Sequence, residues 1–126
     1  MIVTAPIAVG ELFDKITILR LKAAKLRDPA RVANVTKELQ ALEAMAAGVP
    51  ASPALDSLVG RLHQINAALW EVEDGKRAHE REHRFDADFI QLARRVYLEN
   101  DLRAAIKREI NTVTGSALTE EKSYDQ

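Results

Sequence analysis

Apolar residues recur at helical spacing along most of the chain, and polar residues fill the positions between them. From Gly10 to Arg27 the apolar positions lie alternately four and three apart, which is the spacing of one face of an α-helix. This stripe consists of Leu12, Ile16, Leu19, Ala23 and Leu26. The pattern predicts a first helix over residues 10–27.

Two further helices begin at a capping residue. Asp28 and Ser52 are each followed directly by a proline, which suits the first helical position because its missing N–H needs no partner there. The stripes that follow contain Val32, Val35, Leu39, Leu42 and Ala46 in the first case, and Leu55, Leu58, Val59, Leu62, Ile65, Leu69 and Val72 in the second. The sequence therefore predicts helices over residues 29–47 and 53–83.

A fourth helix is predicted over residues 86–114. Asp86 is its capping residue, and Phe85 is placed to pack against Ile90 across the first turn. The apolar stripe contains Phe89, Leu92 and Val96, and it then moves to Leu102, Ile106, Ile110 and Val113. Because the face moves, we expect a twist or kink near residue 100.

Four amphipathic helices with short joints predict a single all-α domain over residues 1–126. We expect an up-and-down helical bundle dominated by a long antiparallel hairpin of the third and fourth helices. Two helical hairpins that pair in a dimer are the alternative arrangement. Residues 1–9 form an N-terminal arm, and residues 116–126, which lack periodicity, form a tail.

Composition narrows the functional classes. The chain has 18 basic and 19 acidic residues and a net charge of −1, so it lacks the basic surface of nucleic-acid or anionic-membrane binders. It has no cysteine, which excludes disulfide scaffolds, thiol nucleophiles and thiolate zinc sites. The apolar start is too short for a signal peptide or a membrane span. We expect a cytoplasmic protein with no nucleic-acid partner and no membrane insertion.

The segment His79-Glu80-Arg81-Glu82-His83 matches the HExxH pattern of zinc peptidases. Two histidines four apart on a helix can bind zinc while the glutamate activates water, and Glu99 is the candidate third ligand. The chain lacks the strands that hold substrate in such enzymes, and nearby arginines add positive charge. A zinc-dependent hydrolase is therefore the weakest of the alternatives.

Polar residues form a second pattern, in stripes beside the apolar seams of the two long helices. The stripe on the third helix contains Asn66, Trp70, Glu73 and Arg77 with Asp74 beside it, and that on the fourth contains Asn100, Arg103, Lys107 and Asn111 with Arg94, Tyr97 and Asp101 beside it. In an antiparallel hairpin, Glu73 and Asp74 can meet Arg94 or Arg103. Two interpretations stay open: a structural network, or the wall of a ligand pocket.

The N-terminal charged residues have a simple explanation. Glu11 and Asp14 open the first helix, where carboxylates complement the helix dipole, and Lys15 follows them. No glycine-rich phosphate loop and no serine beside a histidine partner is present, so nucleophilic catalysis has no candidate. No cofactor is indicated.

Four segments carry a family resemblance: GELFDKITIL, LWEVED, FDADFIQLARRVYLENDLRAAIKREIN and GSALTEEKSY. On these, the chain resembles an uncharacterised family of small all-helical bacterial domains, over nearly its whole length except the second helix. The resemblance implies an association with glycosyltransferases of lipopolysaccharide and surface-polysaccharide synthesis. It also implies that the tail residues Glu120 to Tyr124 dock on the bundle or on a partner, and it leaves His79 and His83 outside the family pattern.

Two hypotheses of function follow. The first is a non-catalytic helical interaction module, a homo-oligomer with a protein partner such as a glycosyltransferase. The second is a binding or catalytic domain for an anionic ligand such as a nucleotide sugar or sugar phosphate, because Arg and Lys suit phosphate geometry. The candidate ligand- or partner-binding residues are Trp70, Glu73, Asp74, Arg77, Arg94, Tyr97, Asn100, Asp101, Arg103 and Lys107.

Overall fold

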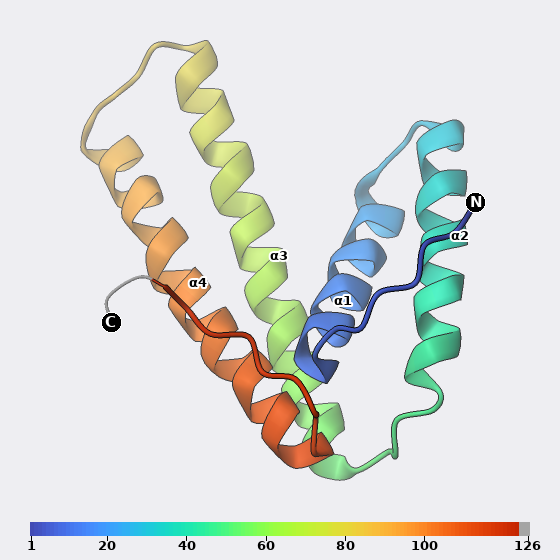
Figure 1. Cartoon of the computed structure of the whole chain (residues 1–126). Helices are drawn as coiled ribbons and strands as arrows, with labels where there is room; N and C mark the ends of the chain where they lie inside the picture. Colours follow the sequence, from blue (N-terminus) through green and yellow to red (C-terminus); the bar gives the residue numbers. More distant parts are fainter. Residues whose placement is uncertain (124–126) are drawn as a thin grey trace.

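The computed structural model describes residues 1–123, which contain four helices and no strand (Figure 1). The helices are α1 (Val9–Lys25), α2 (Pro29–Ala46), α3 (Pro53–Arg81) and α4 (Ala87–Thr114). Each begins and ends within two residues of the range expected from the apolar pattern. The all-α class and the long α3–α4 hairpin are confirmed.

Side-chain caps start three of the helices as predicted. Asp28, Ser52 and Asp86 each accept a backbone N–H from the first turn of their helix, at 3.0, 3.1 and 3.0 Å. Each bond satisfies one of the N–H groups that a helix start leaves without a partner. Local sequence therefore explains where α2, α3 and α4 begin.

The first turn of α4 brings two aromatic rings together. Phe85 lies edge-on against Phe89, with 5.4 Å between ring centroids, while Ile90 is 55% exposed. The expected packing of Phe85 against Ile90 stays a prediction. Both apolar side chains stay largely open to solvent at the tip of the α3–α4 hairpin.

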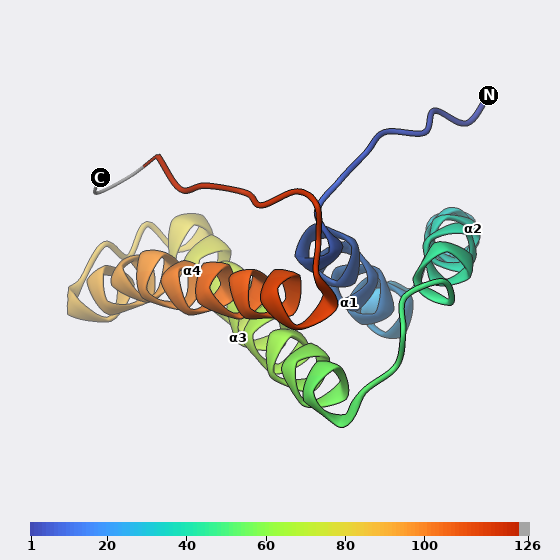
Figure 2. The same ribbon diagram turned by 60° about the horizontal axis from the view of Figure 1, so that its bottom comes forward.

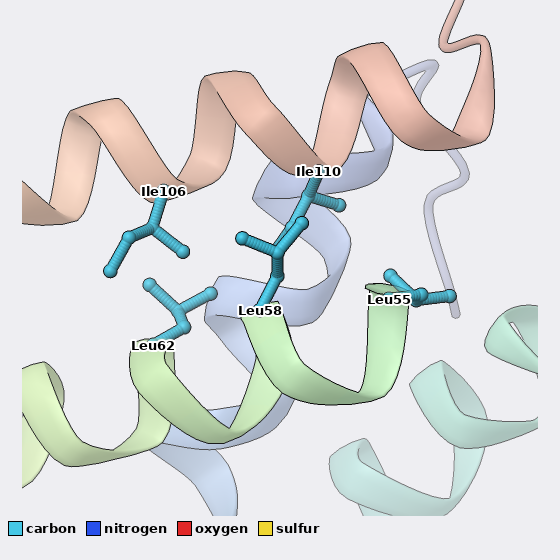
Figure 3. Packing of buried hydrophobic residues seen from close by; sticks show 5 residues of the cluster. All are labelled: Leu55, Leu58, Leu62, Ile106 and Ile110. Atoms are coloured by element: carbon cyan, nitrogen blue, oxygen red, sulfur yellow. The ribbon is translucent and has the colours of Figure 1, made fainter. Parts of the chain in front are cut away.

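The main apolar core lies where α3 begins and α4 ends (Figure 3). Three leucines of α3, at 55, 58 and 62, face Ile106 and Ile110 of α4. Leu62 and Ile110 have no exposed surface, and burying each such side chain contributes about 1.5–3 kcal/mol. Half-buried Val9 and Phe13 of α1 close this core from the side.

The helices do not surround one common core. Helix α1 packs against α2, α3 and α4, whereas α2, within the described residues, packs against α1 alone. Figure 1 shows the result, a V in which the α1–α2 hairpin diverges from the α3–α4 hairpin. None of the residues of α2 is fully buried.

This arrangement corrects the predicted apolar face of α4. Ile106 and Ile110 are buried as expected, but Leu102 and Val113 are 55% and 47% exposed. The prediction placed all four on one covered face. The reason for the difference is that α2, which could cover the outer side of α4 in a closed bundle, lies on α1 instead.

Helices α1 and α4 approach closely at Gly10. A Cβ atom at this position would lie 2.4 Å from the carbonyl oxygen of Lys107 and 3.0 Å from the side-chain oxygen of Asn111. The nearest obstacle is backbone, which cannot rotate away. Only glycine allows this contact between α1 and α4.

Replacing Gly10 by alanine should therefore force α1 away from α4 and lower the free energy of unfolding by about 1–3 kcal/mol. The matched control is Gly60→Ala in α3, where nothing lies within 4 Å of the new Cβ and alanine favours the helix by about 0.5–1 kcal/mol. Urea unfolding of the wild type, Gly10→Ala and Gly60→Ala measures whether the first change destabilises the protein and the second stabilises it. Equal effects at the two positions would contradict the close approach.

Candidate functional site

A charged carboxylate lies buried between α1, α3 and α4. The Asp14 residue is only 1% exposed. Arg103 of α4 donates two hydrogen bonds to it, from Nε to Oδ1 at 2.9 Å and from Nη2 to Oδ2 at 2.5 Å. A two-point guanidinium–carboxylate bond of this kind is strong and directional, so it sets the position of α4 relative to α1.

Helix α3 contributes a hydrogen-bond donor to Asp14 through Asn66, whose side chain is buried. Its Nδ2 group donates to Asp14 Oδ1 and to Thr17 Oγ1, both at 2.9 Å. The Thr17 hydroxyl in turn donates to the Asp14 carbonyl oxygen at 2.8 Å. Burial of a carboxylate is costly without such partners, and here both of its oxygens are bonded.

Lys107 extends this arrangement toward the surface. Its Nζ lies 2.6 Å from Glu11 Oε2, 2.9 Å from Glu120 Oε2 and 3.9 Å from Asp14 Oδ2. We name the charged cluster by its members: Glu11, Asp14, Thr17, Asn66, Arg103, Lys107 and Glu120. It contains three carboxylates and two cations, so its formal charge at neutral pH is −1.

In the cluster, the pKa values of Asp14, Arg103, Lys107 and Glu120 are shifted in the direction that keeps these groups charged. Burial raises the pKa of Asp14, but hydrogen bonds from Arg103 and Asn66 and the positive charges nearby outweigh burial and lower it below 3.8. Burial lowers the pKa of Lys107, and bonds to Glu11 and Glu120 raise it overall. The hydrogen bond from Lys107 lowers the pKa of Glu120. These shifts favour the charged forms of Asp14, Lys107 and Glu120.

The start of α1 is capped by distant parts of the chain. Its N-cap residue, Ala8, offers no side-chain acceptor. Asn111 Oδ1 accepts the Gly10 N–H at 2.7 Å, and Ser116 Oγ accepts the Val9 N–H at 3.1 Å. Residues at the end of α4 therefore do for α1 what Asp28, Ser52 and Asp86 do locally for the other helices.

After α4 the tail turns back along that helix (Figure 2). Gly115 makes the turn with a left-handed φ of 64°, a conformation that glycine adopts without strain. The paired residues are Glu120 with Lys107, Glu121 with Arg108 and Lys122 with Asp101. Tail docking is seen for residues 116–123, while the expected contribution of Tyr124 lies outside the described residues.

A groove of about 490 Å³ lies between the tail and α4. Polar side chains dominate its lining, among them Glu11, Tyr97, Asn100, Asp101, Arg103, Lys107, Glu120 and Lys122. Each of its three cations is already within 4 Å of a carboxylate. An incoming anion would have to compete with these carboxylates.

The structure brings together only part of the predicted set. Asn100, Asp101, Arg103 and Lys107 lie side by side at the groove, with Tyr97 beside them. Asn100 accepts a hydrogen bond from Arg103 at 3.3 Å. This half of the set forms one site.

The α3 members lie elsewhere and have other partners. Glu73 pairs with Lys76 at 3.2 Å, so the expected pairing of Glu73 or Asp74 with Arg94 or Arg103 is wrong. Trp70 is half-buried beneath Lys25 of α1, whose Nζ is 5.8 Å from the ring centroid. Asp74 and Arg77 are exposed, and Arg94 bonds to the Tyr97 hydroxyl at 3.5 Å.

The sequence pattern does not predict Asp14 as the central residue of the charged cluster. The helix dipole alone accounts for a carboxylate near the start of α1, yet Asp14 accepts hydrogen bonds from both Asn66 and Arg103. A signal was present, because Gly10, Asp14, Thr17 and Leu21 are spaced four, three and four apart and form a second face of α1. All four are buried, so α1 is covered on two sides.

The predicted zinc ligands are not arranged to bind a metal ion. Helix α3 ends at Arg81, so His83 lies beyond it, with a left-handed φ of 53° and an exposed side chain. The two histidines therefore do not share a helical face, and Glu99 pairs with Arg95 at 3.7 Å. In residues 1–123 no group of three or more His, Cys, Asp or Glu side chains is arranged to hold a metal ion.

Fold and site define a small all-α domain whose charged residues converge on one buried carboxylate. Among residues 1–123, none of the helices is both long and apolar enough to span a bilayer. Residues 3–126 match the family of unknown function DUF6165, and the chain belongs to this family. Neither a curated protein nor a solved structure matches it.

Replacing Asp14 by asparagine should lower the free energy of unfolding by on the order of 3 kcal/mol, because it leaves Arg103 partly buried without a negative partner. The control is Glu43→Gln, which removes an exposed pair with Arg20 at 3.5 Å and should cost less than about 1 kcal/mol. Chemical denaturation measures both. Similar losses for the two variants would contradict a structural role for the buried pair.

Acid should destabilise the protein through the same carboxylate. The folded pKa of Asp14 lies below its unfolded value of 3.8, so its contribution to stability is complete above 3.8 and is lost as the pH falls through the folded value. The free energy of unfolding should therefore fall below pH 3.8. The fall should be less steep in Asp14→Asn, where only groups such as Asp86 and Glu120 still contribute. Parallel pH profiles would contradict this assignment.

Proposed function

We propose that this protein is a non-catalytic helical interaction module that self-associates and supports cytoplasmic enzymes of bacterial surface-polysaccharide or lipopolysaccharide synthesis, with a glycosyltransferase as its partner. One observation carries the first part. The charged residues best placed for chemistry are bonded to each other, while large apolar side chains remain at the surface of α4 and of the hairpin tip. The link to polysaccharide synthesis rests on the family resemblance.

The balance of charge supports a structural cluster over a catalytic one. Arg103 and Lys107 are neutralised by Asp14, Glu11 and Glu120, and the pKa of each cation is raised. Catalytic acids and bases usually have pKa values moved toward neutrality, which is the opposite tendency. The polar stripe of α4 therefore fits a role in holding α1 and the tail in place.

Exposed apolar side chains supply the surface that a partner needs. At the hairpin tip, Phe85 and Ile90 are 56% and 55% exposed and lie five residues apart in sequence. Farther along α4, Leu98 and Leu102 are also about half exposed. Apolar residues grouped on one helix are typical of protein-binding surfaces.

The second candidate is a domain that binds an anionic ligand such as a nucleotide sugar. The groove beside Tyr97, Asn100 and Lys107 favours it, because its volume of about 490 Å³ suits a small molecule. A phosphate would have to displace Glu120 from Lys107. The surplus of negative charge in the cluster opposes this exchange.

Affinity capture from a native lysate should retain an enzyme of surface-polysaccharide synthesis on the wild-type protein. The double variant Phe85→Ser/Ile90→Ser should lose it, because the apolar tip is gone. Ile2→Ser, on the exposed N-terminal arm, is the control and should retain it. A binding measurement with the two purified proteins then tests whether the captured enzyme is a direct partner.

The ligand alternative is tested in parallel by thermal shift with inorganic phosphate, UDP and nucleotide sugars. No stabilisation is expected. Stabilisation by these ligands that disappears in Lys107→Ala, together with no captured enzyme, would reject the interaction module in favour of the binding domain.

A further inference from the structure

Helix α4 carries a second heptad seam that no part of the described chain covers. Its positions are spaced alternately four and three apart: Gln91, Arg95, Leu98, Leu102, Ala105, Glu109 and Thr112. Every one of them is exposed. Such spacing keeps one stripe facing a partner helix along its length, as in a two-stranded coiled coil.

The order of residue types along this α4 seam is self-complementary. Arg95 lies seven residues before Leu102, and Glu109 lies seven residues after it. Seven residues are two helical turns, or about 10.5 Å along the axis. Apolar Leu98 and Ala105 lie between these charges and the centre, one on each side.

We propose that the α4 seam binds the α4 seam of a second copy of this chain in an antiparallel dimer, with its two-fold axis at Leu102. The two Leu102 side chains then meet each other, and each Leu98 lies against Ala105 of the other copy. Arg95 of each chain lies opposite Glu109 of the other, which forms two equivalent ion pairs. A parallel dimer would instead place Arg95 against Arg95 and Glu109 against Glu109, so charge selects the antiparallel direction.

The contacts that these charged residues make within one chain do not block the dimer. Arg95 pairs with Glu99 at 3.7 Å and Glu109 with Arg61 at 3.6 Å, and the side chains are exposed in all cases but Glu99. Exposed pairs of this kind contribute little to stability, so exchanging them costs little.

The ion pairs of the tail go to residues outside the seam. Glu120, Glu121 and Lys122 pair with Lys107, Arg108 and Asp101. Lys122 lies at the edge of the seam, in a groove that Ala105, Glu109 and Thr112 also line. On the neighbouring face of α4, Ile106 and Ile110 pack into the core with α3. The helix can therefore bind α3 and a second α4 at the same time.

A two-fold contact uses the same patch on both chains and closes after two copies. It therefore predicts a dimer rather than a filament. The seam is short and only half apolar, so we expect an association that depends on concentration and on salt. This inference deepens the proposed function by naming the partner of one surface, and it leaves the hairpin tip for the enzyme partner.

Sedimentation velocity from micromolar to millimolar protein at low salt should show a monomer–dimer equilibrium. Leu102→Glu should weaken it at least about tenfold, since it places two like charges on the axis. The matched control is Ile90→Glu, because Ile90 is on the same helix and is 55% exposed, as Leu102 is, but lies off the seam. It should leave the equilibrium unchanged. A wild-type monomer at every concentration, or equal effects of the two variants, would overturn the proposal.

Charge reversal tests the direction of the helices. Arg95→Glu or Glu109→Arg alone should weaken the dimer by roughly tenfold, and the two changes together should restore it. Because the chain has no cysteine, disulfide cross-linking of introduced cysteines gives a second test of the helix direction. A mixture of Arg95→Cys and Glu109→Cys chains should cross-link, whereas Arg95→Cys alone should not. Cross-linking of Arg95→Cys with itself would indicate a parallel dimer and reject the proposal.

These outcomes separate the dimer from the proposed function. If the wild-type protein is a monomer yet captures a polysaccharide enzyme through Phe85 and Ile90, the α4 dimer and the self-association are wrong and the enzyme-binding role stands. If it dimerises through Leu102 but captures no enzyme, the reverse holds. Unchanged circular dichroism melting of each variant confirms that the fold is retained.

Discussion

The buried ion pair between Asp14 and Arg103 determines how the rest of this structure is arranged. A carboxylate with 1% of its surface exposed is tolerated only where donors surround it, and here the donors come from α3 and α4. The directions of these hydrogen bonds to Asp14 specify the register of α1 against the α3–α4 hairpin. In that register Gly10 touches the backbone of α4, and Asn111 reaches the N–H groups at the start of α1. The pair therefore specifies position, whereas the leucine and isoleucine core supplies the apolar stabilisation.

This use of polar residues has a consequence for function. Once α1 is held by Asp14, its two remaining tasks are to cover the main core and to carry α2, which packs on its far side. The outer face of α4 then has no helix over it, and Leu98 and Leu102 stay exposed. The fold thus buries the Asp14 carboxylate and leaves apolar side chains of α4 exposed. This distribution is consistent with the interaction module proposed above.

Sequence reasoning grouped the residues of α4 correctly and assigned them the wrong partners. Asn100, Arg103 and Lys107 follow one helical face, and they do form one site. The hairpin predicts Glu73 and Asp74 as their acidic partners, because both long helices belong to it. The acids that bind them are Asp14 and Glu11 of α1 and Glu120 of the tail. These lie 89, 96 and 13 residues away in sequence, and helical periodicity carries no information on pairs so far apart.

Local sequence by itself determined the four helices, since periodicity marks their faces and Asp28, Ser52 and Asp86 mark three of their starts. Such signals act over three or four residues, within one turn. Tertiary structure alone decided that α2 leaves α4 uncovered and that Asp14 is buried instead of facing solvent near a helix start. The physical reason is that burial depends on which helices meet. An amphipathic helix records that it has a face to cover, but it does not record which helix covers it.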